Sequence, residues 1–258
     1  MKLYYKDYEL PSFQINDNGY FLPWDDSLDY YINNRFKDLV YKNEISDYVI
    51  KAEDNDQYFN EADILSKINL NEDGYFDFSK AIIDIGAYSG CYSFRSYFKY
   101  VYAFEPNKTM FTCLNMNLLM HNKLEYSETF NILLSDKQEL IKFNGFFTPY
   151  WDGKNWGGED SKLDESKEIL SHTLDEYNLN NVGFIKIDVE GMEEKVLRGG
   201  IGTIIRNNYP PILFELFDIG YYGTPKEKHD SLQNFLENLG YEIIWYWGDH
   251  ATHLAIHK

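Results

Sequence analysis

A carboxylate and two glycines lie in one apolar segment near the middle of the chain. In AIIDIGAYSG (residues 81–90), Asp84 lies within the apolar run, and Gly86 and Gly90 follow it four residues apart. Ligands of parallel sheets bind outside the carboxyl ends of the strands, where glycines permit a tight turn and a close approach to the backbone. The spacing D-x-G-x-x-x-G differs from the G-x-G-x-x-G pattern of dinucleotide sites, so this turn alone does not identify a ligand.

Two further segments end in polar residues. Glu105 closes VYAFEPN, about twenty residues beyond the glycine turn, where a carboxylate can accept hydrogen bonds from both hydroxyls of a ribose. Pro106 then stops the strand. In ILLSD (residues 132–136), Ser135 and Asp136 suit an adenine edge, although Asp136 could equally cap a helix. The strand ends together predict an adenosine ligand.

A lysine and three carboxylates belong to two later apolar segments. In FIKIDVEG, the side chains of Lys186, Asp188 and Glu190 point the same way because strand residues alternate with period two. Charged groups on one face of a central strand are costly unless they are paired or functional. Glu215 closes PPILFE, which we expect to be the neighbouring strand. We therefore expect the three carboxylates to converge on a substrate hydroxyl.

Two mechanisms fit these carboxylates, and the sequence does not choose between them. One carboxylate, with its pKa raised by burial and like charges, can act as general base on the hydroxyl. Alternatively, Asp188 and Glu190 hold Mg²⁺ or Mn²⁺, which acidifies the hydroxyl. His172, just before TLDEY, is a third candidate base. Structural roles compete with these: Glu190 can cap a helix, Lys186 can pair with Asp188, and a lone histidine is often solvated.

A long aromatic segment, GFFTPYWDGKNWGGED (residues 145–160), separates two of the expected core strands. Loops of this length in compact domains are usually lids or binding loops. Its aromatic rings and hydrogen-bonding groups suit the apolar face and hydroxyl rim of a sugar, or the aromatics simply cover the edge of the sheet. The candidate acceptor-binding residues are Tyr150, Trp151, Asp152, Asn155 and Trp156.

The elements that must position these residues alternate between strand and helix from Ala81 onward. Continuous apolar strands separated by helical segments predict an α/β fold with a parallel sheet covered on both faces. YEIIWYWG and HLAIHK near the end predict a closing hairpin. Residues 1–80 differ: short aromatic strands up to Pro23 precede two amphipathic helices expected over 25–40 and 56–68. We expect an α-rich N-terminal cap over residues 1–80 and a catalytic domain over 81–258.

Composition excludes several classes of partner. Among 258 residues, 42 acidic against 24 basic side chains give a formal net charge of −18, which repels nucleic acid and anionic membrane surfaces. The sequence shows neither a signal peptide nor a membrane-spanning run, which predicts a soluble, cytoplasmic protein, in the host cytoplasm if the source is a virus. Cys91 and Cys113 lack the spacing of a disulfide framework or zinc site and read as reduced core thiols. The cap could form a homodimer face or narrow the acceptor cleft.

Six segments, in order, resemble the FkbM family of S-adenosylmethionine-dependent methyltransferases. They are IIDIGAYSG, VYAFEPN, ILLSD, HTLDEY, FIKIDVEGMEEKVLRGG and PPILFE, within residues 81–217. The resemblance implies a Rossmann-like, seven-stranded class I methyltransferase sheet and methylation of a hydroxyl. It also implies that Asp84, Gly86 and Gly90 line the methionine moiety. Glu105 would lie at the ribose, and Ser135 and Asp136 at the adenine. Tyr88 and Pro106 are further candidate cofactor-binding residues.

The function predicted from the sequence is therefore O-methylation of a sugar, glycan or related natural product, with S-adenosyl-L-methionine as cofactor. Carboxylates at the strand ends favour this cofactor because its sulfonium and ammonium groups are cationic. Two alternatives remain open at this point. An NAD-dependent oxidoreductase would also use Glu105, and a non-catalytic module could bind an adenosyl ligand without turnover.

Overall fold

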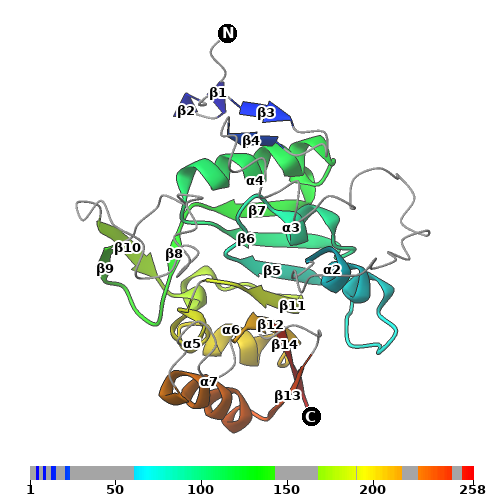
Figure 1. Cartoon of the computed structure of the whole chain (residues 1–258), viewed down its shortest axis with the longest axis vertical. Helices are drawn as coiled ribbons and strands as arrows, with labels where there is room; N and C mark the ends of the chain where they lie inside the picture. Colours follow the sequence, from blue (N-terminus) through cyan, green and yellow to red (C-terminus); the bar gives the residue numbers. More distant parts are fainter. Residues whose placement is uncertain are drawn as a thin grey trace, which may run out of the picture.

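A seven-stranded sheet forms the centre of the computed structural model (Figure 1). The structure describes residues 4–5, 8–9, 13–15, 21–23, 61–142, 168–189, 191–216, 226–245 and 252–258. The strands of the central sheet lie in the order β13-β14-β12-β11-β5-β6-β7. Their bounds are β5 Ala81–Ile85, β6 Tyr100–Phe104, β7 Ser127–Phe130, β11 Val182–Ile187, β12 Ile212–Glu215, β13 Tyr241–Trp245 and β14 Thr252–His257.

The strand order reverses between β5 and β11. From β5 the chain proceeds to β6 and β7 on one side, and it later adds β11 and β12 on the other side, all of them parallel. The hairpin of β13 and β14 closes the sheet as predicted, with β14 antiparallel to both of its neighbours. Ile85 lies opposite both Phe104 and Ile187, so three strands end at one level. This is the switch point at which open α/β sheets bind ligands.

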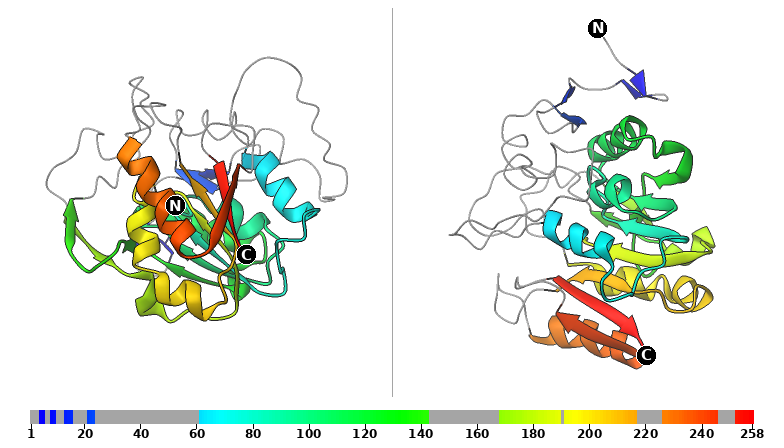
Figure 2. Two further views of the ribbon diagram at one scale, coloured as in Figure 1. Left: turned by 90° about the horizontal axis from the view of Figure 1, so that it is seen from below. Right: turned by 90° about the vertical axis from the view of Figure 1, so that its right-hand side faces the viewer.

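Helices cover both faces of the sheet, which confirms the predicted α/β class (Figure 2). The helices are α2 Glu61–Leu70, α3 Cys91–Arg95, α4 Lys108–Met120, α5 Glu193–Arg198, α6 Ile201–Arg206 and α7 Lys226–Asn238. Ile82 packs with α2, α3 and α4, whereas Ile83 and Ile85 pack with α5, α6 and α7, because strand side chains alternate. Within the described ranges, none of these helices is long and apolar enough to cross a membrane.

Among its described residues, the N-terminal region contributes short strands and the helix α2. Two antiparallel pairs are formed by β1 Tyr4–Tyr5 with β2 Tyr8–Glu9 and by β3 Phe13–Ile15 with β4 Phe21–Pro23. The helix expected over 25–40 lies outside the described residues, and the one expected over 56–68 is observed as α2. Ile64, Leu65 and Ile68 of α2 pack in the same core cluster as Phe184 of β11. The predicted domain boundary after residue 80 remains a prediction, and this packing joins α2 to the sheet.

One strand lies in a different sheet from the one expected. Ser135 and Asp136 do follow a strand, β8 Leu133–Leu134, but β8 joins a second sheet, because β7 of the central sheet stops at Phe130. The Asn131 side chain donates hydrogen bonds to the carbonyls of Glu105 (2.8 Å) and Pro106 (2.9 Å). These bonds replace the ladder between β6 and β7 and turn the chain away. The second sheet has the order β8-β10-β9, with β9 Leu140–Lys142 and β10 Glu168–His172.

Both cysteines are free thiols inside helices, in agreement with their predicted role in the core. Cys91 begins α3 and Cys113 lies within α4, and both are buried. Burial raises the pKa of the Cys113 thiol. That thiol is therefore unsuited to nucleophilic chemistry, which requires the thiolate.

Candidate active site

The glycine turn after β5 has an unusual backbone conformation. Gly86 (φ +71°), Tyr88 (φ +52°) and Gly90 (φ +94°) all adopt the left-handed region. A Cβ at Gly86 would overlap the carbonyl oxygen of Asp188, so only glycine fits between β5 and the end of β11. The amides of Gly86 and Ala87 both donate to the Phe104 carbonyl, each at 3.0 Å. The turn is therefore pressed against the ends of β6 and β11.

Glu105 joins the glycine turn to the start of α4. Its carboxylate accepts hydrogen bonds from the Tyr88 amide at 2.8 Å and from the Asn107 amide at 2.7 Å. The residue is only 6% exposed. Desolvation by burial raises the pKa of Glu105 to about 7, against the opposing effect of those two amides. Pro106, the next residue, separates the end of β6 from α4.

Asp84 is enclosed within the protein. Its side chain is fully buried in β5, and Ser93 Oγ donates a 2.6 Å hydrogen bond to Asp84 Oδ2. Asp84 Oδ1 accepts no hydrogen bond in the described part of the chain and has Lys186 Nζ 3.4 Å away. The predicted contact with a methionine moiety stays a prediction, and the observed partners of the carboxylate belong to the protein.

Lys186 lies between the glycine turn and the end of β11. Its buried ammonium donates to the Gly86 carbonyl at 2.9 Å and lies 3.9 Å from Asp188 Oδ2. The same nitrogen is 5.4 Å from the centre of the Tyr92 ring, within range of a cation–π contact. The pairing of Lys186 with Asp188 agrees with the structural role considered from the sequence, but the ammonium is closer to Asp84.

Asp188 and Glu215 occupy neighbouring positions at the carboxyl ends of β11 and β12. Ile187 lies opposite Phe214 in the register, so the next residues, Asp188 and Glu215, lie side by side at the edge of the sheet. The Asp188 side chain is 35% exposed, which leaves it accessible from solvent. Glu190, the third carboxylate expected in this group, lies outside the described residues. The described residues contain no group of three or more His, Cys, Asp or Glu side chains that could hold a metal ion.

Glu193 is a buried carboxylate that sequence reasoning missed. It begins α5, and its Oε1 accepts hydrogen bonds from the amides of Val189 (3.1 Å) and Gly191 (3.0 Å). These bonds fix the loop that follows Asp188. Burial raises the pKa of Glu193. The sequence does show an acidic residue in the first helical turn after DVEG. Such a residue is equally typical of an exposed side chain that stabilises the helix dipole.

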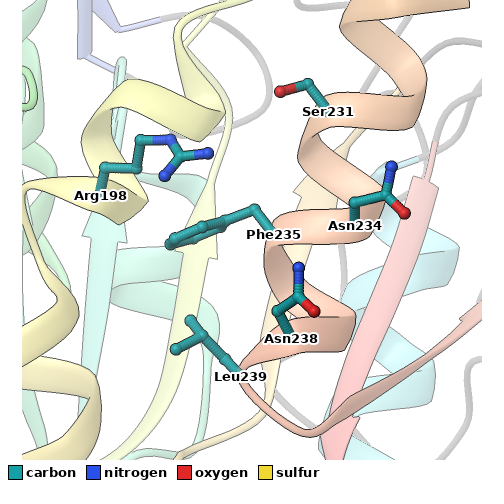
Figure 3. Close-up of a pocket in the computed structure, with 6 residues that line it drawn as sticks. All are labelled: Arg198, Ser231, Asn234, Phe235, Asn238 and Leu239. Atoms are coloured by element: carbon teal, nitrogen blue, oxygen red, sulfur yellow. The ribbon is translucent and has the colours of Figure 1, made fainter.

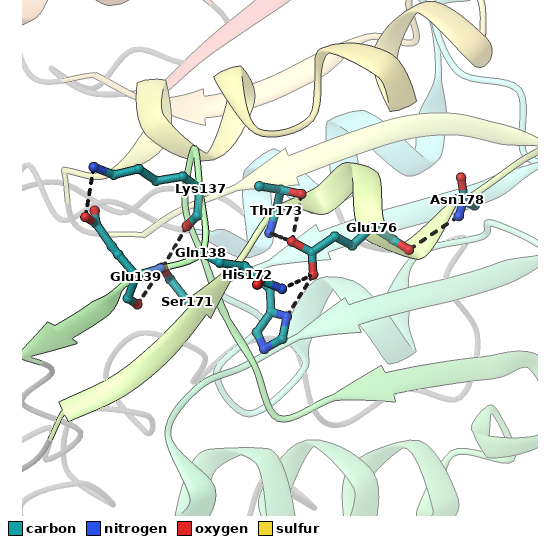
Figure 4. A network of polar contacts seen from close by, with 8 residues as sticks. All are labelled: Lys137, Gln138, Glu139, Ser171, His172, Thr173, Glu176 and Asn178. Atoms are coloured by element: carbon teal, nitrogen blue, oxygen red, sulfur yellow. Dashed lines mark hydrogen bonds and ion pairs between the residues drawn. The ribbon is translucent and has the colours of Figure 1, made fainter.

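His172, Ser135 and Asp136 belong to the second sheet. His172 ends β10, and its carbonyl accepts a 2.8 Å hydrogen bond from the Ser135 amide. The His172 ring nitrogen Nδ1 lies 2.9 Å from Glu176 Oε2, and Glu176 Oε1 also accepts the Thr173 amide (Figure 4). The Thr173 amide and the His172 ring hold the pKa of Glu176 at about 2. His172 is therefore paired with Glu176, which together with Thr173 forms the capping box of the short helix η3 Leu174–Tyr177.

The second sheet nevertheless lies beside the central one. The Tyr177 ring packs against Phe104 at 5.1 Å and Phe130 at 4.8 Å, which are the last residues of β6 and β7. Ser135 is fully buried, and its Oγ donates to Asp136 Oδ1 at 3.2 Å. The predicted acceptor residues are not part of the described structure: Tyr150, Trp151, Asp152, Asn155 and Trp156.

A surface pocket of about 410 Å³ lies between α5 and α7, away from the strand ends (Figure 3). It is lined by Arg198, Ser231, Asn234, Phe235, Asn238 and Leu239. The Arg198 guanidinium lies 4.4 Å from the centre of the Phe235 ring and pairs with Glu194. None of the predicted site residues lines this pocket, so we assign it to helix packing.

A family model described as "Methyltransferase FkbM domain" matches residues 84–243. The match begins at Asp84 in β5 and extends into β13, so it includes the glycine turn, Glu105 and the end of β11. A search of curated proteins gave no match.

Several solved structures are similar to this chain at low sequence identity. Methyltransferase FkbM from Methylobacillus flagellatus KT has 16% identity and a TM-score of 0.48, over 70% of this chain and 44% of that one. A precorrin-6y C5,15-methyltransferase from Geobacter metallireducens GS-15 has 16% identity and a TM-score of 0.43, over 77% and 89%. A ribosomal protein L11 methylase from Lactobacillus delbrueckii subsp. bulgaricus has 12% identity and a TM-score of 0.42, over 78% and 80%. The chain thus spans less than half of the Methylobacillus protein.

Proposed function

Since this chain belongs to the FkbM methyltransferase family, we propose that it transfers a methyl group from S-adenosylmethionine to a hydroxyl of a sugar, glycan or related natural product. The observation that carries the proposal is the strained turn 86–90 beside the buried carboxylate of Glu105, at the switch point of the sheet. Open α/β sheets hold the ribose of a nucleotide at such a carboxylate. When bound, S-adenosylmethionine supplies a methyl carbon activated by a positively charged sulfur.

The chemistry of Glu105 fits the ribose of this cofactor. Each carboxylate oxygen carries two lone pairs, and each oxygen of Glu105 uses one of them for a backbone amide. One lone pair on each oxygen remains for a ribose hydroxyl. Burial raises the pKa of Glu105 to about 7, which disfavours the ionised carboxylate. Hydrogen bonds donated by the ribose hydroxyls would favour the ionised form and so lower this pKa.

Charge and shape support the remaining cofactor roles. Asp84 lies next to the glycine turn, paired with Lys186, and a carboxylate near that end of the ligand favours its cationic sulfonium and ammonium groups. Asp84 would act through Lys186 and the turn rather than by direct contact, because its side chain is enclosed. We propose that Asp136, which is exposed, contacts the adenine edge and that Ser135, which is fully buried and donates to Asp136 Oδ1, positions it.

Asp188 is the residue best placed to accept the proton of the acceptor hydroxyl. Methylation of a hydroxyl by the bound cofactor would release the hydroxyl proton, and a base of the protein would have to accept it. Asp188 is exposed at the end of β11, Lys186 holds it in place, and Glu215 lies beside it on β12. His172 suits this role less well, because it ends β10 in the second sheet and not a strand of the central sheet.

The acceptor class is proposed from composition. Tyr150, Trp151 and Trp156 offer flat apolar faces, and Asp152 and Asn155 offer hydrogen-bonding groups, a combination that suits a sugar. The acidic strand ends and the net charge of −18 favour a neutral acceptor over a phosphorylated one.

Turnover on a panel of sugars tests the proposal. The purified protein is incubated with S-adenosylmethionine and neutral mono- and oligosaccharides, and mass spectrometry records products heavier by one methylene group. A methyl ether on at least one sugar, abolished in Asp188→Asn, is the expected result. Parallel reactions with Mg²⁺ or a chelator decide whether Asp188 and Glu190 use a metal. Binding of NAD in place of S-adenosylhomocysteine would contradict the proposal.

A further inference from the structure

The turn 86–90 needs support from its surroundings. The backbone of Tyr88 adopts the left-handed conformation, which residues other than glycine rarely take. Gly86 and Gly90, on either side of it, are left-handed as well. Such conformations persist only where neighbouring groups hold them, and they gather at ligand sites. The turn 86–90 therefore requires side chains that hold its backbone in place.

Three side chains from different elements hold the turn by its backbone. Glu105 at the end of β6 accepts the Tyr88 amide at 2.8 Å, and Lys186 of β11 donates to the Gly86 carbonyl at 2.9 Å. The third is Asn117 of α4, whose Nδ2 donates to the Ser89 carbonyl at 2.8 Å. Each of the three bonds fixes a different peptide group, so together they determine the path of the turn.

Asn117 is a surprising residue at this place in α4. It is 0% exposed and lies on the face of the helix that carries Leu114 and Leu118 into the core. A leucine there would bury more apolar surface, and asparagine is a weaker helix former than leucine. The buried amide is therefore explained by its hydrogen bond to Ser89, which is itself only 1% exposed.

We propose that Asn117 is a positioning residue for the cofactor turn. By fixing the Ser89 carbonyl, it keeps the turn in the conformation that the adenosyl cofactor requires, so that binding costs little additional ordering. The proposal rests on the proposed function, because it takes the turn to be the cofactor site. Helix α4 thereby contributes to cofactor affinity through a side chain enclosed in the core.

Asn115 provides a matched control in the same helix. It is also 0% exposed, and its amide donates to the Phe111 carbonyl at 2.7 Å and accepts the Thr129 hydroxyl at 2.8 Å. Asn115→Ala thus removes a buried amide from α4 with a comparable loss of stability. Asn117→Leu is a second variant that removes the donor while retaining side-chain bulk, which guards against a variant that fails to fold.

The experiment measures S-adenosylhomocysteine binding by isothermal titration and the melting temperature of each variant. We expect Asn117→Ala and Asn117→Leu to bind roughly five- to tenfold more weakly, as for loss of one hydrogen bond. Asn115→Ala should bind like the unaltered protein at a similarly lowered melting temperature. Amide hydrogen exchange at residues 87–90 should accelerate in Asn117→Leu but not in Asn115→Ala.

Two results would overturn the positioning role. One is unchanged affinity in both Asn117 variants, and the other is equal weakening in Asn115→Ala, which would indicate a general effect of α4. If the unaltered protein binds no S-adenosylhomocysteine, the proposed function itself fails, and the role of Asn117 fails with it.

Discussion

Glu105 and Asp188 are carboxylates at the same edge of the sheet, but the protein holds them differently. Glu105 is 6% exposed, and two backbone amides fix both of its oxygens. Asp188 is 35% exposed, and its ion-pair partner Lys186 is 3.9 Å away. A fixed, buried carboxylate suits a ligand that must be held in one position. An accessible carboxylate suits a proton transfer, because it can exchange its proton with water after each turnover.

The largest expected effect separates the two roles. Asp188→Asn should lower kcat roughly 10²- to 10⁴-fold, the usual contribution of a general base. Its affinity for S-adenosylhomocysteine should change by less than about threefold, since that site is held by Glu105 and the turn. Steady-state kinetics and isothermal titration measure the two quantities. Loss of binding in this variant would place Asp188 at the cofactor instead.

A smaller effect is expected from the loop that carries Asp188. Glu193→Ala should lower kcat about tenfold, because the amides of Val189 and Gly191 lose the acceptor that fixes the loop. Glu194→Ala is the matched control, since the adjacent Glu194 bonds instead to Arg198 and Ser231. Equal kcat values for the two variants would show that the loop needs no such support.

The pH dependence of Glu105 sharpens the comparison further. Burial raises its pKa from 4.5 to about 7, so the folded protein binds this proton more tightly than the unfolded chain does. The resulting stability is fully present below pH about 4.5 and is lost as the pH rises through about 7. Affinity for S-adenosylhomocysteine should rise over the same interval, because the ionised carboxylate accepts more hydrogen bonds. Urea unfolding and isothermal titration at several pH values measure both trends.

Glu105→Gln is the control for that titration. A glutamine keeps the size of the side chain and cannot ionise, so both trends attributable to residue 105 should disappear in this variant. An unchanged pH dependence would assign the titration to another group.

The smallest effect is expected at the proposed adenine edge. Ser135→Ala should weaken S-adenosylhomocysteine binding about two- to threefold, the loss of one modest hydrogen bond. Ser127→Ala, at the start of β7, is the control, because its hydroxyl bonds to the Leu124 carbonyl. A change at Ser127 as large as that at Ser135 would remove Ser135 from the cofactor site.

The main strands were predictable because they are continuous apolar runs. Every residue of β5 and β11 is buried, and short continuous apolar runs of this kind are typical of strands in a parallel sheet covered on both faces. The fate of ILLSD was not predictable in this way. The side chain of Asn131 ends β7 by bonding to carbonyls of the neighbouring chain segment, a contact that exists only after the strands have paired.

The candidate site shows the same division. Glu105 was identifiable because a carboxylate directly after a strand has a recognised position relative to the glycine turn. Glu193 and Asn117 were missed because each lies inside a helical segment, where its residue type suggests solvent exposure. Their hydrogen bonds reach the 188–191 loop and the Ser89 carbonyl, and only the packing of the helices on the sheet brings these groups together.

We propose that the turn 86–90 and Glu105 form the cofactor site. Isothermal titration of S-adenosylhomocysteine into the unaltered protein, Glu105→Ala and the control Glu128→Ala tests it most directly. Glu128 is a suitable control because its exposed carboxylate bonds to the Tyr100 hydroxyl. We expect Glu105→Ala to bind roughly 100-fold more weakly, since one side chain serves both the ribose and the turn, and Glu128→Ala to bind normally. Equal affinity in all three proteins would contradict it.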